Sequence, residues 1–235
     1  MSMTVATQLS VPQDQVLHLG VGALIHDVGM LRVPPELRQA PRQLTEAERF
    51  EVSRHPLHTL DCLERVGNLN DLSLIVAYQI HERGDRSGYP RQRPLTTIHP
   101  LARLAAIADT YAAITAQRPH RNARGPYEAM ETLLRETSRN RFDRQVMRCF
   151  LDCISLFPIG SYVRLSNGQL AKVLRANPGL HTQPVVVPLH DDGTESGIEL
   201  DLSCEHGLAV IQALRDDHEL AIARANGTRR QGARS

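Results

Sequence analysis

Leu24-Ile25-His26-Asp27-Val28-Gly29 places an imidazole beside a carboxylate directly after an apolar run with helical character. Burial of a carboxylate is costly unless the group is paired or binds a metal. If the helix ends near Gly29, a positively charged His26 at its C-terminus would interact favourably with the helix dipole, whereas the negative charge of Asp27 would not. The stretch therefore predicts a functional site, and a bound metal is a natural partner for it.

Three later segments offer further candidate ligands. The first is the run His81-Glu82-Arg83-Gly84-Asp85-Arg86-Ser87-Gly88-Tyr89-Pro90. Asp109 lies in an apolar helical stretch, so we expect it to be buried beside a cation, either a metal or a neighbouring Arg. His55 precedes Pro56 in a predicted helix, and a kink at this proline would orient the imidazole. Together these residues favour metal-assisted hydrolysis of a phosphate ester.

Taken in order, the motifs resemble those of the HD-GYP phosphohydrolases, bacterial enzymes that hydrolyse cyclic di-GMP. The resemblance covers residues 15–155 and rests on His26-Asp27-Val28-Gly29, His55-Pro56, His81-Glu82, Asp85, Gly88-Tyr89-Pro90, Ile107-Ala108-Asp109, Arg118-Pro119 and Arg121. It implies a mainly α-helical, HD-type core and metal-dependent phosphodiesterase activity.

The resemblance also implies roles for individual residues. The implied metal ligands are His26, Asp27, His55, His81 and Asp109, with Asp27 as a bridge and His26 and Asp27 at the catalytic centre. Nitrogen and oxygen ligands without thiolates suit one or two ions of iron or manganese. The implied substrate-binding residues are Arg118, Arg121, Gly88 and Tyr89. From the residues alone, the two arginines are equally ordinary surface charge, and Glu82 is equally a surface acid.

Several family positions are changed. Met30 replaces a Lys, Ile80 replaces the first His of a His-His-Glu motif, Arg86 replaces a Gly and Ala112 replaces an Asp. Family members carry a further ligand on an upstream helix, whereas no His precedes His18 here. Two hypotheses follow: a weakened cyclic di-GMP phosphodiesterase, or a catalytically degenerate module that senses a nucleotide or binds a signalling partner. A plain HD phosphohydrolase for other nucleotides is disfavoured by the Gly-Tyr-Pro loop.

The pattern of residues along the sequence predicts a helical domain over residues 1–156 and a small β appendage over 157–204. We expect the appendage to have a structural role or to contact a partner. Within these two regions we expect helices at 14–29, 46–65, 98–117, 126–138 and 141–156, a type I′ turn at Asn167-Gly168 and an edge strand at 185–187. The capping box Thr45-Glu46-Ala47-Glu48 predicts the start of the helix at 46–65, and Asn70 or Asp71 is expected to cap a further helix that extends through Ile80. A last helix (205–224) and a disordered basic tail are expected within 205–235.

Composition excludes several classes of function. The 235 residues carry a net charge of +1, which gives no basis for a nucleic-acid polymer or an anionic membrane as partner. No apolar stretch approaches the roughly 20 residues that span a bilayer, and no signal peptide is apparent. Four cysteines without Cys-x-x-Cys spacing are expected to be reduced. These features predict a cytoplasmic protein.

Overall fold

The computed structural model describes residues 1–117, 124–214 and 221. The chain divides into two compact units, one formed by residues 1–123 and 133–149 and the other by residues 124–132 and 150–235. Within the described residues, no helix is both long and apolar enough to cross a membrane.

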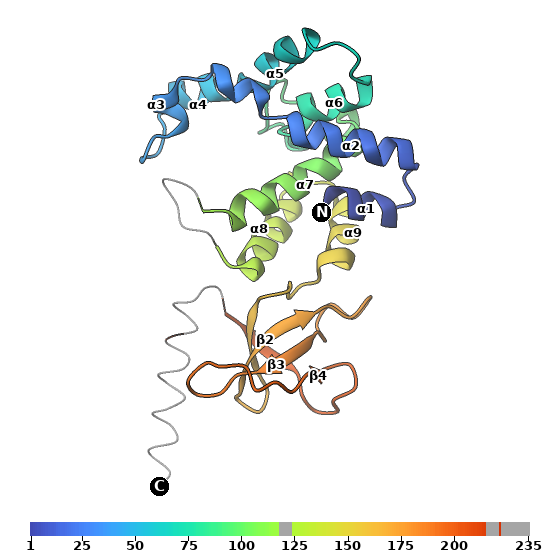
Figure 1. Cartoon of the computed structure of the whole chain (residues 1–235), viewed down its shortest axis with the longest axis vertical. Coiled ribbons are helices and arrows are strands. Elements are labelled where there is room, and N and C mark those ends of the chain that lie inside the picture. The colour runs from blue at the N-terminus through green and yellow to red at the C-terminus, as the bar shows by residue number, and fades with distance from the viewer. Residues whose placement is uncertain (118–123, 215–220, 222–235) are drawn as a thin grey trace. The chain divides into compact units, whose positions relative to one another are not determined.

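Helices account for the first unit, as the sequence predicts. In chain order they are α1 (Ser2–Gln8), α2 (Gln13–Ile25), the 3-10 helix η1 (Val28–Arg32), α3 (Pro35–Arg38), α4 (Glu46–Val52), α5 (His55–Glu64), α6 (Asp71–Gln79), the 3-10 helix η2 (Leu95–Thr97), α7 (Pro100–Thr115), α8 (Pro126–Ser138) and α9 (Arg144–Ile154). Residues of α8 and α9 belong to both units. Helix α2 packs against α6, and α7 packs against α1, α2 and α6 (Figure 1).

The break between α4 and α5 decides where His55 lies. The predicted capping box is present, since Thr45 and Glu48 each accept a backbone N–H from the other. The expectation of one helix from 46 to 65 is wrong, because α4 ends at Val52 and α5 begins at His55. Pro56 lies in the first turn of α5, where a missing N–H costs nothing. The proline therefore restarts the helix, and His55 becomes its first residue.

Helix α5 approaches η1 more closely than a side chain at position 29 would allow. A Cβ atom on Gly29 would overlap the carbonyl oxygen of His55 and the backbone nitrogen of Thr59. The fully buried Thr59 hydroxyl donates to the carbonyl of His26 at 2.7 Å and accepts from the Gly29 N–H at 2.9 Å. One hydroxyl thus satisfies two backbone groups that emerge at the end of α2, and fixes that end against α5.

A five-stranded antiparallel sheet forms the centre of the second unit. The strands are β1 (Tyr162–Leu165), β2 (Leu170–Arg175), β3 (Val185–Pro188), β4 (Leu200–Asp201) and β5 (Val210–Ala213), in the order β4-β3-β2-β1-β5. Alternate residues of β1 and β2 are buried, which matches the period of two expected for strands with one face toward a core. Phe157, Val163, Leu165, Val173 and Val186 are among the core residues.

Three expectations for this unit are corrected. The segment expected to be helical from 205 contains β5, which pairs with β1; the need of that strand for a partner overrides local helix propensity. Strand β3 is not an edge strand, because it lies between β2 and β4 and pairs with both; β4 pairs with Val185 and Val186. At Asn167-Gly168 only the glycine has a positive φ, 90°. The Gly168 N–H bonds to the Leu165 carbonyl at 2.8 Å, so the turn is not type I′, which requires two positive φ values. The expected basic tail lies outside the described residues.

The approach of α5 to η1 predicts that Gly29→Ala destabilises the fold by about 3 kcal/mol, because the added methyl group meets backbone that cannot move independently. Gly20→Ala is the matched control. Its Cβ would contact the flexible Met3 side chain, with the sulfur at 2.6 Å, and alanine is the better helix former. Chemical denaturation should show a loss of stability for the first variant and little change for the second; equal stabilities would contradict the packing argument.

The Thr59 hydroxyl predicts a second effect. Thr59→Val keeps the shape but leaves a buried carbonyl and a buried N–H without partners, so we expect a loss of about 2–4 kcal/mol. Thr59→Ser retains the hydroxyl and should recover at least half of this loss. If valine and serine destabilise the protein equally in thermal melts, the hydrogen bonds are not what holds these segments together.

Candidate metal centre

The side chains that the sequence predicts as metal ligands converge in the first unit. His26 and Asp27 directly follow α2, and His55 begins α5. His81 lies just beyond α6, and Asp109 lies on α7. The site therefore draws on the ends of three helices and the side of a fourth, all of them elements of one unit.

Two carboxylates face three imidazole rings at short range. His26 Nε2 lies 3.3 Å from Asp27 Oδ2 and 3.7 Å from Asp109 Oδ1. His55 Nε2 lies 3.3 Å from Asp27 Oδ1. His81 lies 3.8 Å from Asp27 Oδ1 through Nε2, and 3.8 Å from Asp109 Oδ2 through Nδ1. The two oxygens of Asp27 thus face different imidazoles.

Backbone carbonyls orient two of the rings. His26 Nδ1 lies 2.7 Å from the carbonyl of Ala23, and His55 Nδ1 lies 2.9 Å from that of Val52. A carbonyl can only accept, so Nδ1 carries the hydrogen in both rings. In the neutral imidazole, Nε2 then presents a lone pair. Metal-binding histidines are commonly held in this way.

These lone pairs require a cation. Among the described residues, the Nε2 atoms of His26, His55 and His81 are buried and have no hydrogen-bond partner. Each faces carboxylate oxygen, which is also an acceptor, so only a proton or a metal ion makes the contact favourable. Protons on all three neighbouring rings would repel one another. The ligand set therefore fits a metal ion, and atoms of His26, Asp27 and His81 lie close enough together to hold one.

The cluster is buried on one side and open on the other. The side chains of the three histidines are at most 13% exposed, that of Asp109 is 24% exposed and that of Asp27 is 59% exposed. Asp109 was expected to be buried beside an arginine or a metal. Its ion-pair contacts within the described residues are with His26 and His81. The exposed edge at Asp27 gives a ligand access from solvent.

The surroundings of the candidate ligands shift their pKa values in different directions. Partial burial raises the pKa of Asp27, but the three imidazoles outweigh this and hold the pKa far below its usual range, so the group is a carboxylate at neutral pH. Burial lowers the pKa of His26, yet Asp27 and Asp109 outweigh burial and the net pKa is raised. Burial dominates at His81, and its pKa is lowered. His81 is therefore neutral and able to act as a ligand at neutral pH.

The Gly-Tyr-Pro loop packs directly on the cluster. The Tyr89 ring stacks on His81 with centroids 5.0 Å apart and meets His55 edge-on at 5.8 Å. The Tyr89 N–H donates to the His81 carbonyl at 3.2 Å. Gly88 is buried, and a Cβ there would overlap the backbone of Arg83. This glycine is therefore required for close packing, and a substrate-binding role for Gly88 and Tyr89 remains a prediction.

Glu82 has a structural role that the sequence left open. Its carboxylate is 2% exposed and accepts the backbone N–H groups of Arg91 at 2.8 Å and Arg93 at 2.9 Å. Gln92, between them, has a φ of 55°. Such a left-handed residue turns successive N–H groups toward one anion. Glu82 thus anchors the far end of the loop behind His81.

Sequence reasoning also missed Arg83. Its guanidinium donates to the Glu82 carbonyl at 2.8 Å and to Thr110 Oγ1 at 3.1 Å. Because Glu82 follows His81 and Thr110 follows Asp109, Arg83 links the backbone segments that carry these two predicted ligands. Its proximity to the His-Glu motif was the available signal, but the partner on α7 could not be read from the sequence.

The remaining predicted positions differ in outcome. Arg118 and Arg121 lie outside the described residues. Ile80, where the related family has a ligand, is a core residue that is 1% exposed. Ala112 is exposed on α7, and Met30 is partly buried in η1.

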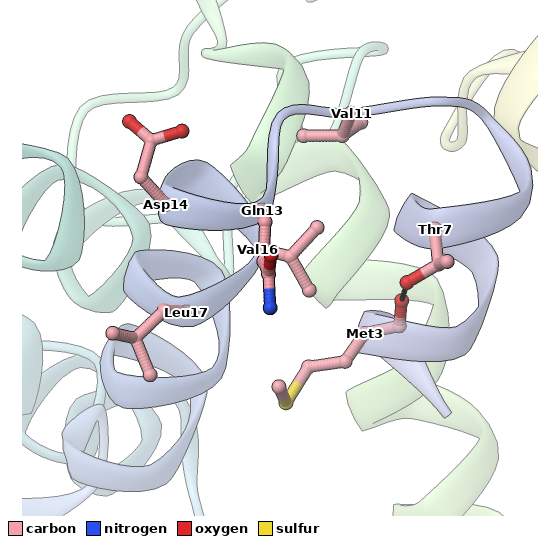
Figure 2. A pocket seen from close by; sticks show the side chains of 7 residues that line it. All are labelled: Met3, Thr7, Val11, Gln13, Asp14, Val16 and Leu17. Atoms are coloured by element: carbon pink, nitrogen blue, oxygen red, sulfur yellow. Dashed lines mark hydrogen bonds between the residues drawn. The ribbon is translucent and has the colours of Figure 1, made fainter.

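A cavity of about 760 Å³ lies between α1 and α2, and none of the five predicted ligands lines it. Figure 2 shows the lining residues Met3 and Thr7 on α1, Val16 and Leu17 on α2, and Val11 in the connection between them. Asp14 contributes the cavity's one acidic side chain. The lining offers no set of converging metal ligands, so the His–Asp cluster remains the candidate site.

Two proteins with similar sequences are cyclic dinucleotide phosphodiesterases by name. Cyclic di-GMP phosphodiesterase PA4108 of Pseudomonas aeruginosa is 35% identical over 173 residues, which cover 73% of this chain and 41% of that protein. The 3'3'-cGAMP-specific phosphodiesterase 1 of Vibrio cholerae is 35% identical over 59% of this chain and 31% of that protein. This chain thus spans about two fifths or less of these relatives.

A solved structure supports the fold. Bd1817, a HDG"Y"P protein from Bdellovibrio bacteriovorus, matches with a TM-score of 0.53 and 19% identity, over 65% of this chain and 48% of that chain. The family model for the HD domain matches residues 1–146. The chain therefore belongs to the HD domain family, within which it resembles the HD-GYP proteins.

Proposed function

We propose that this chain is a metal-dependent phosphodiesterase that hydrolyses cyclic di-GMP. The observation that carries the proposal is the cluster of three buried imidazole nitrogens and two carboxylates, open to solvent at Asp27. The names of the relatives, which specify cyclic di-GMP and 3'3'-cGAMP, support a cyclic dinucleotide as the substrate.

In this proposal the ligands are the Nε2 atoms of the three histidines and the carboxylates of Asp27 and Asp109. Asp27 is the natural bridge, since its two oxygens face different imidazoles. Nitrogen and oxygen donors suit iron or manganese, as one ion or as two whose remaining positions water fills. Such ions supply Lewis-acid stabilisation of a phosphoryl group and activation of a water molecule.

The chain's own residues provide orientation. The backbone carbonyls of Ala23 and Val52 aim two imidazoles, and Tyr89 fixes the plane of the third. Rigid ligands lower the reorganisation that accompanies charge development on the phosphate. Arg118 and Arg121 are the proposed contacts to the substrate phosphates, because a guanidinium binds such oxygens in bidentate fashion.

A second function is favoured by one observation. Ile80 is buried where the resembling family has a ligand, and Met30 offers no cation to a phosphate. A site reduced in this way suits a module that binds the cyclic dinucleotide, or a signalling partner, with little turnover. Measurements of binding and hydrolysis on the same metal-loaded protein separate the two functions.

Metal content is the first test. Elemental analysis after reconstitution with iron or manganese should find at least one ion per chain. Asp109→Ala should lower the affinity for the metal ion by on the order of 100-fold, because it removes one ligand and the carboxylate beside His26 and His81. Asp61→Ala is the control, since this exposed carboxylate pairs with Arg32 away from the cluster. Wild-type protein without metal, or equal losses in both variants, would refute the metal site.

Activity is the second test. Loss of a charged contact to the transition state costs roughly two orders of magnitude in rate, so we expect slow hydrolysis by the wild type. Met30→Lys combined with Ile80→His should raise kcat by at least 10-fold if these positions limit turnover. Because position 80 is buried, thermal melts must first establish that the double variant is folded. A folded, metal-loaded double variant without added activity would favour the binding module.

A further inference from the structure

Arg86 has a backbone conformation that suits glycine. Its φ is 67°, in the left-handed region that L-residues adopt only at a cost. The Arg86 N–H donates to the Arg83 carbonyl at 2.9 Å, so Arg86 is the last residue of a turn. This turn does not require an arginine side chain, because glycine would adopt the same backbone conformation without strain.

The Arg86 side chain adds no contact to the described structure. It is exposed, and none of the ion pairs or side-chain hydrogen bonds within residues 1–117 and 124–214 includes it. Its neighbours differ: Asp85 accepts the N–H and the hydroxyl of Ser87, at 3.0 and 2.6 Å, and lies 3.6 Å from Arg141. Arg86 therefore costs stability in an anchored loop and leaves a guanidinium free to bind something else.

The position of the loop indicates what that is. Tyr89 stacks on His81, and three peptide units separate it from Arg86. Consecutive Cα atoms are about 3.8 Å apart, so the two Cα atoms lie within roughly 11 Å. The flexible arginine side chain extends beyond its Cα, so its guanidinium can approach the rim of the His–Asp cluster beside Tyr89. A free cation beside this cluster complements a phosphate diester, which a guanidinium binds through two N–H groups.

We propose that Arg86 binds a phosphate of the cyclic dinucleotide at the rim of the metal centre. The inference rests on the proposed function, and it adds a substrate-binding residue that the family resemblance does not imply. In this role Arg86 provides the substrate phosphate with a positive charge, whereas Met30, which replaces a lysine of the family motif, provides none. The strain at position 86 is then the cost of placing a cation beside the substrate.

Three substitutions separate charge from strain. Arg86→Gly removes both, Arg86→Gln removes the charge and keeps the strained backbone, and Arg86→Lys keeps the charge. Ser10→Gly is the control for backbone relief, since Ser10 also has a positive φ, 56°, but lies between α1 and α2. The full chain is loaded with manganese, and three quantities are measured: metal content, Tm, and affinity for cyclic di-GMP by calorimetry.

We expect all variants to retain metal. Arg86→Gly and Arg86→Gln should each weaken cyclic di-GMP binding by 10-fold or more, because each loses a charge-assisted contact. Arg86→Lys should bind less tightly than the wild type but more tightly than Arg86→Gln, since a point charge can still meet the phosphate but cannot bind it through two N–H groups. The glycine variants at positions 86 and 10 should raise Tm by about 2–4 °C, and Arg86→Gln should not.

Two results would overturn the inference in distinguishable ways. If metal-loaded wild type neither binds nor hydrolyses cyclic di-GMP, the proposed function fails and the role of Arg86 fails with it. If the wild type binds but Arg86→Gly and Arg86→Gln bind equally well, the function stands and Arg86 is only a surface charge.

Discussion

The Thr59 hydroxyl occupies a space that exists only because position 29 has no side chain. It joins the carbonyl of His26 to the N–H of Gly29, and so fixes the end of α2 against α5. His55 lies one turn before Thr59 on the same helix. The separation between His26 and His55, and hence the position of Asp27 between their rings, follows from this contact. Ligands far apart in sequence can share an ion only where such backbone contacts are tight, because imidazole and carboxylate ligands tolerate little displacement.

Backbone carbonyls at helix ends orient two of the imidazole rings. Both His26 and His55 bond through Nδ1 to a carbonyl three residues earlier, in the last turn of α2 and of α4 respectively. Carbonyls in the last turn of a helix lack intrahelical partners. The fold thus satisfies a helix end and selects an imidazole tautomer with one hydrogen bond. His81 is held differently: the Tyr89 ring stacks on it, and the loop that carries Tyr89 is fixed by the carboxylate of Glu82, which accepts the N–H of Arg91.

Features that depend on local sequence were predictable. The capping box at Thr45, the cap at Asn70 and the apolar character of α7 are present in the structure, and the ordered motifs indicated which side chains converge. Contacts between distant segments were not predictable. Nothing near Thr59 in sequence identifies its partners, and the carboxylate of Glu82 finds N–H groups nine and eleven residues later. Strand β5 was missed for the same reason, since its partner β1 lies far upstream.

The identity of residue 80 bears on how many ions the cluster can satisfy. A buried imidazole at that position would need its own partner, whereas Ile80 is 1% exposed and packs in the core without one. The remaining donors are three imidazole nitrogens and two carboxylates that already face one another at 3.3–3.8 Å. Shared by one ion, these donors leave few coordination positions for water; shared by two, they leave many. A phosphate oxygen can replace water at each coordination position that water holds. With fewer protein ligands, the substrate itself therefore provides a larger share of the ligands to the metal ions.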